Sequence, residues 1–263
     1  THPGRFDCFH NPLADSQLAY GAARQNILSV ARAKNALSTI SSWPNYQATA
    51  LQQLDTMAEA ANIAKVYYND ESTRFGLKSF KALGGAYAVT RFLQQHLAQV
   101  NGVEPTMEEL LSGQFKAQLK DVVVSCATDG NHGRSVAWGA QMFGCQCIIY
   151  IHRDVSQGRQ AAMEAYAAQV IRITGNYDDS VKQAASDAKQ YGRVIISDTS
   201  YPGYTEIPAN VALGYTVMLA EIVQQLQADV PTHVFVQAGV GGLAAAVCGY
   251  FWDLWGQQRP RFV

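Results

Sequence analysis

A lysine near the start of an expected helix is the first residue whose position suggests chemistry. Lys81 follows Ser79 and Phe80 and precedes a run of small and apolar residues that predicts a helix over residues 82–97. Ser79 occupies the position of a helix N-cap, which puts Lys81 in the first turn. The positive end of the helix dipole disfavours a charged lysine there and so favours the neutral, nucleophilic amine. Such an amine can form a Schiff base with a carbonyl group.

A second motif lies between an expected strand, residues 122–127, and an expected helix, residues 135–143. It reads Thr128-Asp129-Gly130-Asn131-His132-Gly133, and its two glycines let the backbone turn tightly beside a ligand. Open α/β proteins bind ligands at the carboxyl ends of their strands, which is where this motif falls. No second ligand stands at a metal-binding spacing from His132, so we expect a packed structural histidine and no metal site.

A third motif, Gln237-Ala-Gly239-Val240-Gly241-Gly242-Leu243, again joins an expected strand to an expected helix. Successive N–H groups at a glycine-rich turn that begins a helix form an anion site. The motif lacks the Gly-Lys-Ser/Thr ending of a nucleoside triphosphate loop. Ala244 takes the place of the last glycine in Gly-x-Gly-x-x-Gly, which leaves dinucleotide binding as the weaker rival.

Together, and in this order, the three motifs resemble those of the fold type II, or tryptophan-synthase-β-like, pyridoxal-phosphate enzymes. Many members carry Ser-Phe-Lys-x-Arg-Gly, and here residues 79–84 match it with Leu83 in place of the arginine. The resemblance implies pyridoxal 5'-phosphate as the cofactor and assigns Asn131 to its 3'-oxygen and the glycine turn to its phosphate. The cofactor-binding residues that it implies are Lys81, Phe80, Asn131, Gly239, Val240, Gly241 and Gly242, with Val240 replacing a usual glycine.

Two further stretches resemble one branch of the family, the diaminopropionate ammonia-lyases. They are Arg74-Phe-Gly-Leu before the lysine and Asp198-Thr-Ser-Tyr-Pro-Gly-Tyr after the strand at residues 193–197. The resemblance implies a carbon–nitrogen lyase that converts 2,3-diaminopropionate to pyruvate and ammonia by α,β-elimination. Members of the branch accept both stereoisomers, so Lys81 would remove the Cα proton from one face and Asp129 from the opposite face. Asp198 would orient the substrate amine, which completes the three candidate catalytic residues.

The two carboxylates suit a substrate with a second ammonium group, which serine and threonine lack. Their mutual repulsion should raise the pKa of one of them and so leave a proton for the departing amine. Alternatively, Asp129 caps the following helix and Asp198 forms a turn. Two other functions stay open: a serine/threonine dehydratase or other β-eliminating enzyme of the same fold, and a non-catalytic, truncated cofactor-binding protein.

Strands that alternate with helices from residue 121 onward must position these side chains, and the alternation predicts a doubly wound, mostly parallel α/β sheet. Further strands are expected at residues 145–151, 169–173, 193–197 and 232–238, and further helices at residues 156–168, 179–191, 208–226 and 243–255. The predicted fold class is a two-domain α/β fold with flanking helices. Residues 1–72 and 193–263 would form a discontinuous large cofactor-binding domain, and residues 73–192 a small α/β domain.

The first part of the chain is less regular. We expect an irregular start over residues 1–14, helices over residues 15–37 and 49–62, a strand over residues 64–68 and a surface insertion over residues 101–114. Residues 259–263 resemble the start of another strand. Fold type II enzymes usually continue beyond such a point, so we expect this chain to lack its C-terminal part.

The composition of the chain restricts its possible binding partners and its cellular compartment. The chain has 263 residues, 48% of them hydrophobic and 16% charged, which is typical of a globular protein. A formal net charge of -1 argues against nucleic acid or an anionic membrane as the main partner, and no apolar run of membrane-spanning length is expected. The five scattered cysteines indicate buried free thiols and a cytoplasmic setting. The partner is therefore a small amino-acid substrate, and the resemblance implies a homodimer.

Overall fold

The computed structural model describes residues 12, 15 and 17–263, so that most of the predicted irregular start, with Cys8, lies outside the described residues. Its helices are α1 (Gly21–Gln25), α2 (Val30–Ser41), α3 (Asp55–Ala61), α4 (Lys81–Asn101), α5 (Met107–Ser112), α6 (Lys116–Leu119), α7 (Asn131–Phe143), α8 (Gln157–Glu164), α9 (Tyr177–Tyr191), α10 (Glu206–Leu226) and α11 (Gly242–Trp255), with short 3-10 helices η1 (Glu71–Gly76) and η2 (Gly256–Gln258). Its strands are β1 (Leu51–Gln53), β2 (Tyr67–Asn69), β3 (Val123–Ala127), β4 (Gln146–Ile151), β5 (Gln169–Arg172), β6 (Val194–Ile195), β7 (His233–Val234) and β8 (Arg261–Phe262).

Strands β5, β4, β3 and β6 form the main sheet, in that order and all parallel. Alternate residues of each strand face opposite sides of the sheet. Val124 and Cys126 of β3 therefore join the large core beside α4 and α7, whereas Val123 and Ala127 pack in a smaller cluster with Ala184 of α9. Burial on both sides explains the nearly continuous apolar runs of these strands. The predicted parallel α/β fold is confirmed.

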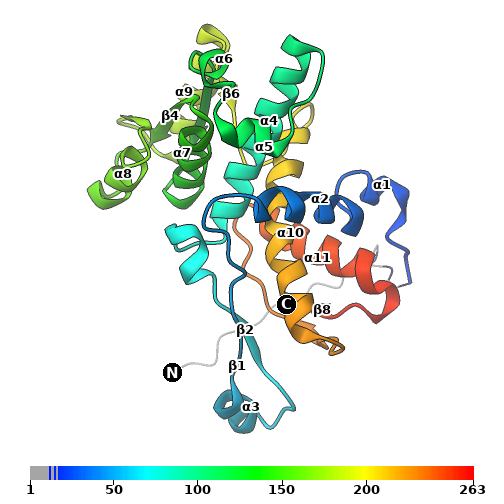
Figure 1. The fold of residues 1–263 in the computed structure, drawn as a ribbon. Helices are drawn as coiled ribbons and strands as arrows, with labels where there is room; N and C mark the ends of the chain where they lie inside the picture. The colour runs from blue at the N-terminus through cyan, green and yellow to red at the C-terminus, as the bar shows by residue number, and fades with distance from the viewer. Residues whose placement is uncertain (1–11, 13–14, 16) are drawn as a thin grey trace.

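Helix α4, which begins at Lys81, is held between α7 and α10 in the centre of the molecule (Figure 1). Glycine residues allow α7 and α10 to approach α4 closely. A Cβ atom on Gly139 of α7 would lie 2.9 Å from the Ala86 Cα atom of α4, and one on Gly214 of α10 would lie 2.5 Å from the Leu83 carbonyl oxygen. The backbones of these helices are therefore in direct contact, which fixes the start of α4 relative to both neighbours.

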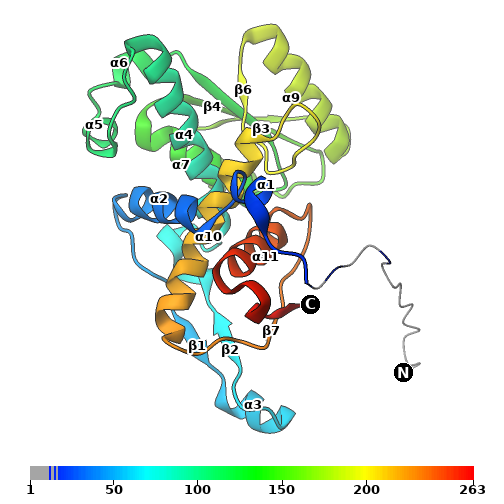
Figure 2. The same cartoon turned by 90° about the vertical axis from the view of Figure 1, so that its right-hand side faces the viewer.

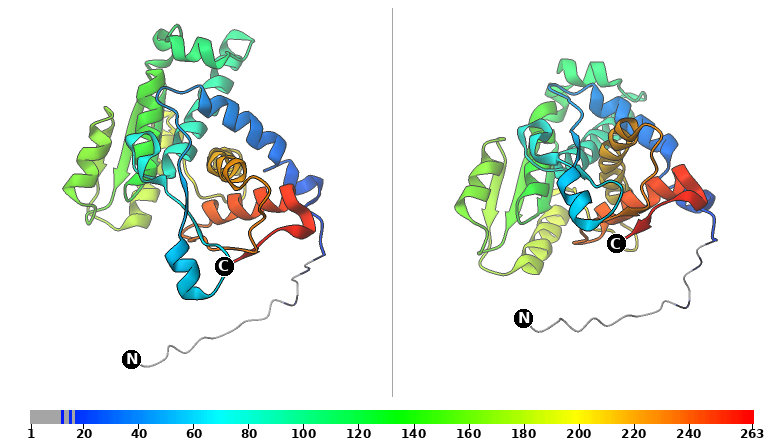
Figure 3. Two further views of the ribbon diagram at one scale, coloured as in Figure 1. Left: turned by 60° about the horizontal axis from the view of Figure 1, so that its bottom comes forward. Right: turned by 90° about the horizontal axis from the view of Figure 1, so that it is seen from below.

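Helices α2 and α11 pack against α10. Figure 3 (left) shows α10 nearly end-on, with α2 in blue and α11 in red beside it. Strands β7 and β8 pair in parallel, which confirms the strand expected after residue 259. Strands β1 and β2 pair in an antiparallel ribbon that carries α3 at its tip and projects from the body (Figures 1 and 2). The division into residues 1–72 with 193–263 and residues 73–192 stays a prediction; β6, just past residue 192, pairs with β3.

Two predicted N-terminal helices are wrong in part. The expected helix over residues 15–37 is split, because Ser29 adopts an extended conformation and its hydroxyl accepts the Arg32 N–H to begin α2, which continues to Ser41. The expected helix over residues 49–62 begins instead with β1, whose pairing with β2 uses the backbone groups that a helix would have used. Only its second half is helical, as α3, and the strand expected at residues 64–68 is shifted to β2.

The expectation that no apolar run reaches membrane-spanning length is wrong for α10. This helix has 21 residues, and by length and composition alone it could cross a membrane. Within the described part of the chain its apolar surface packs against α2, α4 and α11, so its hydropathy is that of a central core helix. The other apolar segments follow the expected pattern: Cys126, Cys145 and Cys147 are buried free thiols, as predicted.

Candidate active site

Lys81 lies at the first position of α4, whose N-cap residue is Phe80 and not the expected Ser79. The hydroxyl oxygen of Ser79 nevertheless accepts the backbone N–H of Lys81 at 3.2 Å. Its amine donates a hydrogen bond to Asp198 Oδ2, and the two side chains are 24% and 12% exposed. The structure thus brings together two of the three predicted catalytic residues. Asp198 follows β6, so this contact joins the helix start to the carboxyl edge of the sheet.

The charge of Asp198 is stabilised by its neighbours. Burial alone would raise the pKa of this carboxyl, but nearby His132 and Lys81 and the hydrogen bond from Lys81 hold it below its ordinary value. The predicted raised pKa, caused by repulsion between two carboxylates, is therefore wrong for Asp198. The physical reason is that the neighbour of the Asp198 carboxylate is the Lys81 amine and not a second carboxylate.

Two aromatic rings flank the Lys81 amine. The nitrogen lies 5.6 Å from the ring centroid of Phe80 and 5.6 Å from that of Tyr215, and the two rings pack edge-to-face with centroids 5.1 Å apart. Tyr215 comes from α10 and is buried, and its hydroxyl has no hydrogen-bond partner in the described part of the chain. Burial, with the field of Asp198, raises its pKa well above the ordinary value. The two rings therefore line one side of the lysine amine, and the Lys81 side chain stays partly accessible.

In the turn after β3, Thr128 and not Asp129 caps the following helix. The Thr128 hydroxyl oxygen accepts the N–H groups of Gly130 and Gly133, at 3.0 and 3.2 Å, and so caps α7. Asp129 is the more exposed residue, and its Oδ1 atom lies 3.0 Å from Nε2 of His152. The alternative in which Asp129 caps the helix is wrong, because Thr128 takes that role. No hydrogen bond joins Asp129 to Asp198.

Asn131 and His132 begin α7 and differ in exposure. The Asn131 side chain is exposed and makes no hydrogen bond within the described residues, so its amide is available to a ligand. His132 is buried, and its Nε2 atom donates to the Ile196 carbonyl oxygen at 2.8 Å, which fits the predicted structural role. Burial lowers the pKa of His132, so that its ring is neutral at neutral pH. Its Nδ1 atom is buried without a partner in the same part of the chain.

The glycine turn lies beside Asp198. A Cβ atom on Gly242 would lie 3.3 Å from the Asp198 carbonyl oxygen, whereas Cβ atoms on Gly239 and Gly241 would meet open space. Gly241 has a φ of 93°, a left-handed conformation that favours glycine, and it precedes α11. The first N–H groups of a helix have no partner within it, and the helix dipole adds positive potential there. This geometry suits an anion next to Asp198.

Each strand of the main sheet delivers a polar side chain at the same edge. Asp129 follows β3, His152 follows β4, Tyr177 begins helix α9 after β5, and Asp198 follows β6. Tyr177 lies within the fields of both carboxylates: burial, then Asp198 and Asp129, raise its pKa to about 12. The sequence reasoning missed His152 and Tyr177. For His152 the available signal was its position directly after an expected strand; Tyr177, a few residues beyond the next strand, offered a weaker one.

The loop that leads to Lys81 is held from two sides. Arg74, fully buried, donates to both Glu221 oxygens of α10 at 2.8 and 2.5 Å, and Arg134 of α7 donates to the Leu77 carbonyl oxygen at 3.1 Å. In the same loop, Phe75 and Lys78 have left-handed φ values of 48° and 57°, which cost about 1–3 kcal/mol each for residues other than glycine. Lys78 itself is exposed. These hydrogen bonds fix the position of the loop that precedes Lys81.

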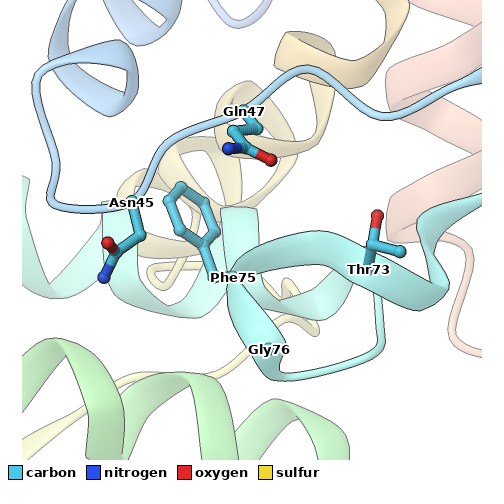
Figure 4. Close-up of a pocket in the computed structure, with 5 residues that line it drawn as sticks. All are labelled: Asn45, Gln47, Thr73, Phe75 and Gly76. Atoms are coloured by element: carbon cyan, nitrogen blue, oxygen red, sulfur yellow. The ribbon is translucent and has the colours of Figure 1, made fainter.

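A surface pocket also adjoins this loop, on the side of Phe75. Figure 4 shows its lining, which is Asn45, Gln47, Thr73, Phe75 and Gly76. Behind it, the Phe75 ring packs against Trp138 with centroids 4.8 Å apart. None of the predicted catalytic or cofactor-binding residues lines this pocket. It is therefore separate from the candidate site at the sheet edge.

Comparison with known proteins gives one family and several relatives. Residues 43–263 match the sequence model of the family described as "Pyridoxal-phosphate dependent enzyme". The chain is 36% identical, over 94% of its length, to a diaminopropionate ammonia-lyase of Escherichia coli (strain K12), and 36% identical over 84% to one of Salmonella typhimurium. It covers 61% and 55% of those two proteins.

Solved structures agree with the sequence comparison. A crystal structure of the Escherichia coli diaminopropionate ammonia lyase, in complex with an aminoacrylate-PLP azomethine reaction intermediate, superposes with a TM-score of 0.79. That match covers 90% of this chain and 59% of the other, at 35% identity. The chain therefore spans a little over half of the length of the relatives that it resembles over most of its own length.

Proposed function

The chain belongs to the pyridoxal-phosphate dependent enzyme family, and we propose that it catalyses the α,β-elimination of 2,3-diaminopropionate to pyruvate and ammonia. The observation that carries this proposal is the set of side chains at one sheet edge: Lys81 in contact with Asp198, and Asp129 on the neighbouring strand end. A diamino acid has a second ammonium group for which these carboxylates are natural partners. The match to two diaminopropionate ammonia-lyases supports the same substrate.

The residues present fit pyridoxal 5'-phosphate. Lys81 is the amine that would hold it covalently, with Phe80 beside it, and the turn of Gly239, Val240, Gly241 and Gly242 would bind its phosphate at the start of α11. Asn131 offers a side-chain amide that has no partner in the described residues. When bound, the cofactor supplies an electron sink for negative charge that develops at the substrate Cα atom.

The chain's own residues would divide the remaining work. Lys81 would accept the Cα proton on one face of the substrate, and Asp129 on the opposite face. Asp198, ionised because its pKa is lowered, would attract and orient the second ammonium group of the substrate. The Phe80 and Tyr215 rings would exclude water from one side of the Lys81 amine. Each of these roles uses a position that the fold fixes.

A substrate profile tests the proposal. Purified full-length protein with added pyridoxal 5'-phosphate is given 2,3-diaminopropionate, serine or threonine, and pyruvate or another 2-oxo acid is measured together with ammonia. We expect diaminopropionate to be preferred. A preference for serine or threonine would replace the proposal by a dehydratase function, and bound cofactor without any turnover would indicate a non-catalytic binding protein.

Two lysine variants are the controls for this experiment. Borohydride reduction of the protein with its cofactor should label the peptide that contains Lys81, as mass spectrometry will show. Lys81→Ala should abolish the label and the visible absorbance of the bound cofactor, whereas Lys78→Ala should retain both, because Lys78 is exposed and outside the site. The opposite pattern would overturn the assignment of Lys81.

We also propose that the protein acts in the cytoplasm as a homodimer. The four described cysteines are unpaired, which is the state expected in a reducing compartment. The homodimer is inferred from the family. Secretion of the protein in its native host would contradict the first proposal, and the second is tested by its mass in solution.

A further inference from the structure

His152 directly follows β4, next to the turn that carries Asp129 after β3, because β3 and β4 are adjacent and parallel. Its Nε2 atom lies 3.0 Å from Asp129 Oδ1. The His152 side chain is only 18% exposed, whereas that of Asp129 is 61% exposed. A largely buried ring thus presents one nitrogen to a carboxylate that is open to a substrate.

The backbone determines which nitrogen of His152 carries the proton. The N–H group of Asp154 lies 3.2 Å from His152 Nδ1 and can only donate, so Nδ1 is the acceptor. The proton of the neutral ring is therefore on Nε2, which donates to Asp129. The Asp154 carboxylate oxygen lies 3.6 Å from Nδ1, beyond hydrogen-bond distance, and does not compete for this role.

Arginines fix both turns. Arg172 Nη1 donates to the carbonyl oxygens of His152, Arg153 and Val155, at 3.2, 2.9 and 2.7 Å. Arg159 Nη1 donates to the Asp129 carbonyl oxygen at 3.3 Å. The backbones of His152 and Asp129 are thus each fixed by an arginine, in addition to the contact between their side chains. A chance contact between two surface side chains would have none of these supports.

We propose that His152 is a positioning residue that holds the Asp129 carboxylate in place as the base for one of the two enantiomers of 2,3-diaminopropionate. The inference rests on the proposed function. The hydrogen bond from Nε2 occupies Oδ1, and Oδ2 has no hydrogen bond within the described residues. Oδ2 is then free to form an O–H bond with the Cα proton as the C–H bond breaks and its electron pair stays with the substrate.

Single-residue variants of the holoenzyme, assayed on each enantiomer separately, test this role. Asp129→Asn first identifies the enantiomer that depends on Asp129. His152→Phe should lower kcat for that enantiomer by about 10- to 100-fold, the usual effect of losing an orienting partner. It should change kcat for the other enantiomer, which depends on Lys81, by less than about twofold. His152→Gln, whose amide can donate to Asp129, should restore part of the loss, and His233→Gln on exposed β7 is the control.

The outcomes separate the two proposals. Loss of turnover by His152→Phe with both enantiomers equally, or with neither, would overturn the positioning role while the proposed function stands. No elimination of either enantiomer by wild-type holoenzyme would overturn the proposed function, and the inference would fall with it. Circular dichroism and bound-cofactor absorbance check that each variant folds.

A second readout does not depend on activity. Nitrogen-15 NMR of the histidine rings distinguishes the two neutral tautomers, and in the cofactor-free protein we expect the His152 proton on Nε2. In Asp129→Asn the Nε2 signal should shift, because its hydrogen-bond acceptor changes from a charged to a neutral oxygen. A proton on Nδ1, or a signal that Asp129→Asn leaves unchanged, would contradict the contact.

Discussion

At the scale of single residues, the site depends on a contact between side chains that are 117 positions apart, Lys81 and Asp198. A lysine at the start of a helix faces the positive end of the dipole, which disfavours its charge. The carboxylate of Asp198 accepts a hydrogen bond from this lysine amine. The same carboxylate becomes available to a substrate ammonium group once Lys81 is engaged elsewhere. One aspartate thus serves both the resting protein and the proposed reaction.

Loss of the Asp198 charge should lower stability in a pH-dependent way. The pKa of Asp198 is lowered from 3.8 in the folded protein, so its contribution to stability is present above pH 3.8 and is lost as the pH falls through the folded value. In cofactor-free protein, Asp198→Asn should reduce the free energy of unfolding by about 1.5–3 kcal/mol at pH 7, because it removes a hydrogen bond between charged groups.

Urea unfolding between pH 7 and pH 3 measures this difference. The unfolding free energies of wild type and Asp198→Asn should differ most at neutral pH, and the difference should begin to shrink as the pH falls below 3.8. Asp121→Asn, at an exposed carboxylate, should match wild type throughout. A difference that grows as the pH falls would show that the Asp198 charge is not stabilised in the folded state.

At the scale of elements, the position of Lys81 is set by the packing of α4 against α7 and α10. The Gly84 backbone meets Tyr215 and Gly214 of α10, and the Gly85 backbone meets Ser135 of α7, whose hydroxyl accepts the Ala86 N–H at 2.9 Å. The first turn of α4 therefore has little freedom to move. The lysine is placed by helix packing rather than by a flexible loop.

Gly214→Ala should disturb this packing. A Cβ atom there would lie 2.5 Å from the Leu83 carbonyl oxygen and 2.8 Å from Gly84 Cα, and both are backbone atoms that cannot move aside alone. We expect the free energy of unfolding to fall by at least about 1–3 kcal/mol, the cost of overpacking a core. Cofactor affinity should also fall, because the start of α4 shifts.

Gly158→Ala is the matched control, because a Cβ atom on Gly158 of α8 meets nothing within 4 Å. It should be neutral or slightly stabilising, since alanine favours a helix more than glycine does. Chemical unfolding and cofactor titration of both variants give the comparison. Equal behaviour of the two variants would contradict the close contact between α4 and α10.

The sequence predicted the regular elements well where burial leaves a clear pattern. Strands β3 and β4 are buried apolar runs bounded by glycine or polar turns, and their bounds agree with prediction within about one residue. The three-residue strand β1, Leu51-Gln52-Gln53, failed because its polar residues show no alternation and its pairing depends on the distant β2. Parallel topology explains why the strand-end aspartates could be predicted as site candidates. His152 follows a strand in the same way, but its contact with Asp129 could not be predicted from the sequence. The His152 contact joins two separate turns, and spacing along a chain does not encode it.

At the scale of the whole molecule, the ribbon of β1, β2 and α3 projects from the body and exposes apolar side chains. Met57, Ile63 and Tyr68 are 55%, 54% and 54% exposed. Projecting ribbons with apolar side chains are suited to contacts with another chain. This ribbon is therefore where we expect part of the proposed homodimer contact.

The dimer prediction is checked by analytical ultracentrifugation. The full-length protein should sediment as a dimer, and a Met57→Ser, Ile63→Ser double variant should shift the equilibrium toward the monomer. Val103→Ser is the control, because Val103 is 74% exposed in the loop after α4, outside the ribbon. A wild-type monomer would contradict the homodimer, and an unchanged dimer in the double variant would exclude the ribbon from the interface.

The long separation of Lys81 and Asp198 also has a consequence during protein synthesis. At about 5–20 residues per second, a ribosome needs roughly 6–23 s to add the 117 residues between them. Throughout that interval the lysine amine lacks Asp198, and strand β6 is made only near its end. Stable capture of the cofactor must therefore wait until most of this chain has left the ribosome, however early the helix that carries Lys81 forms.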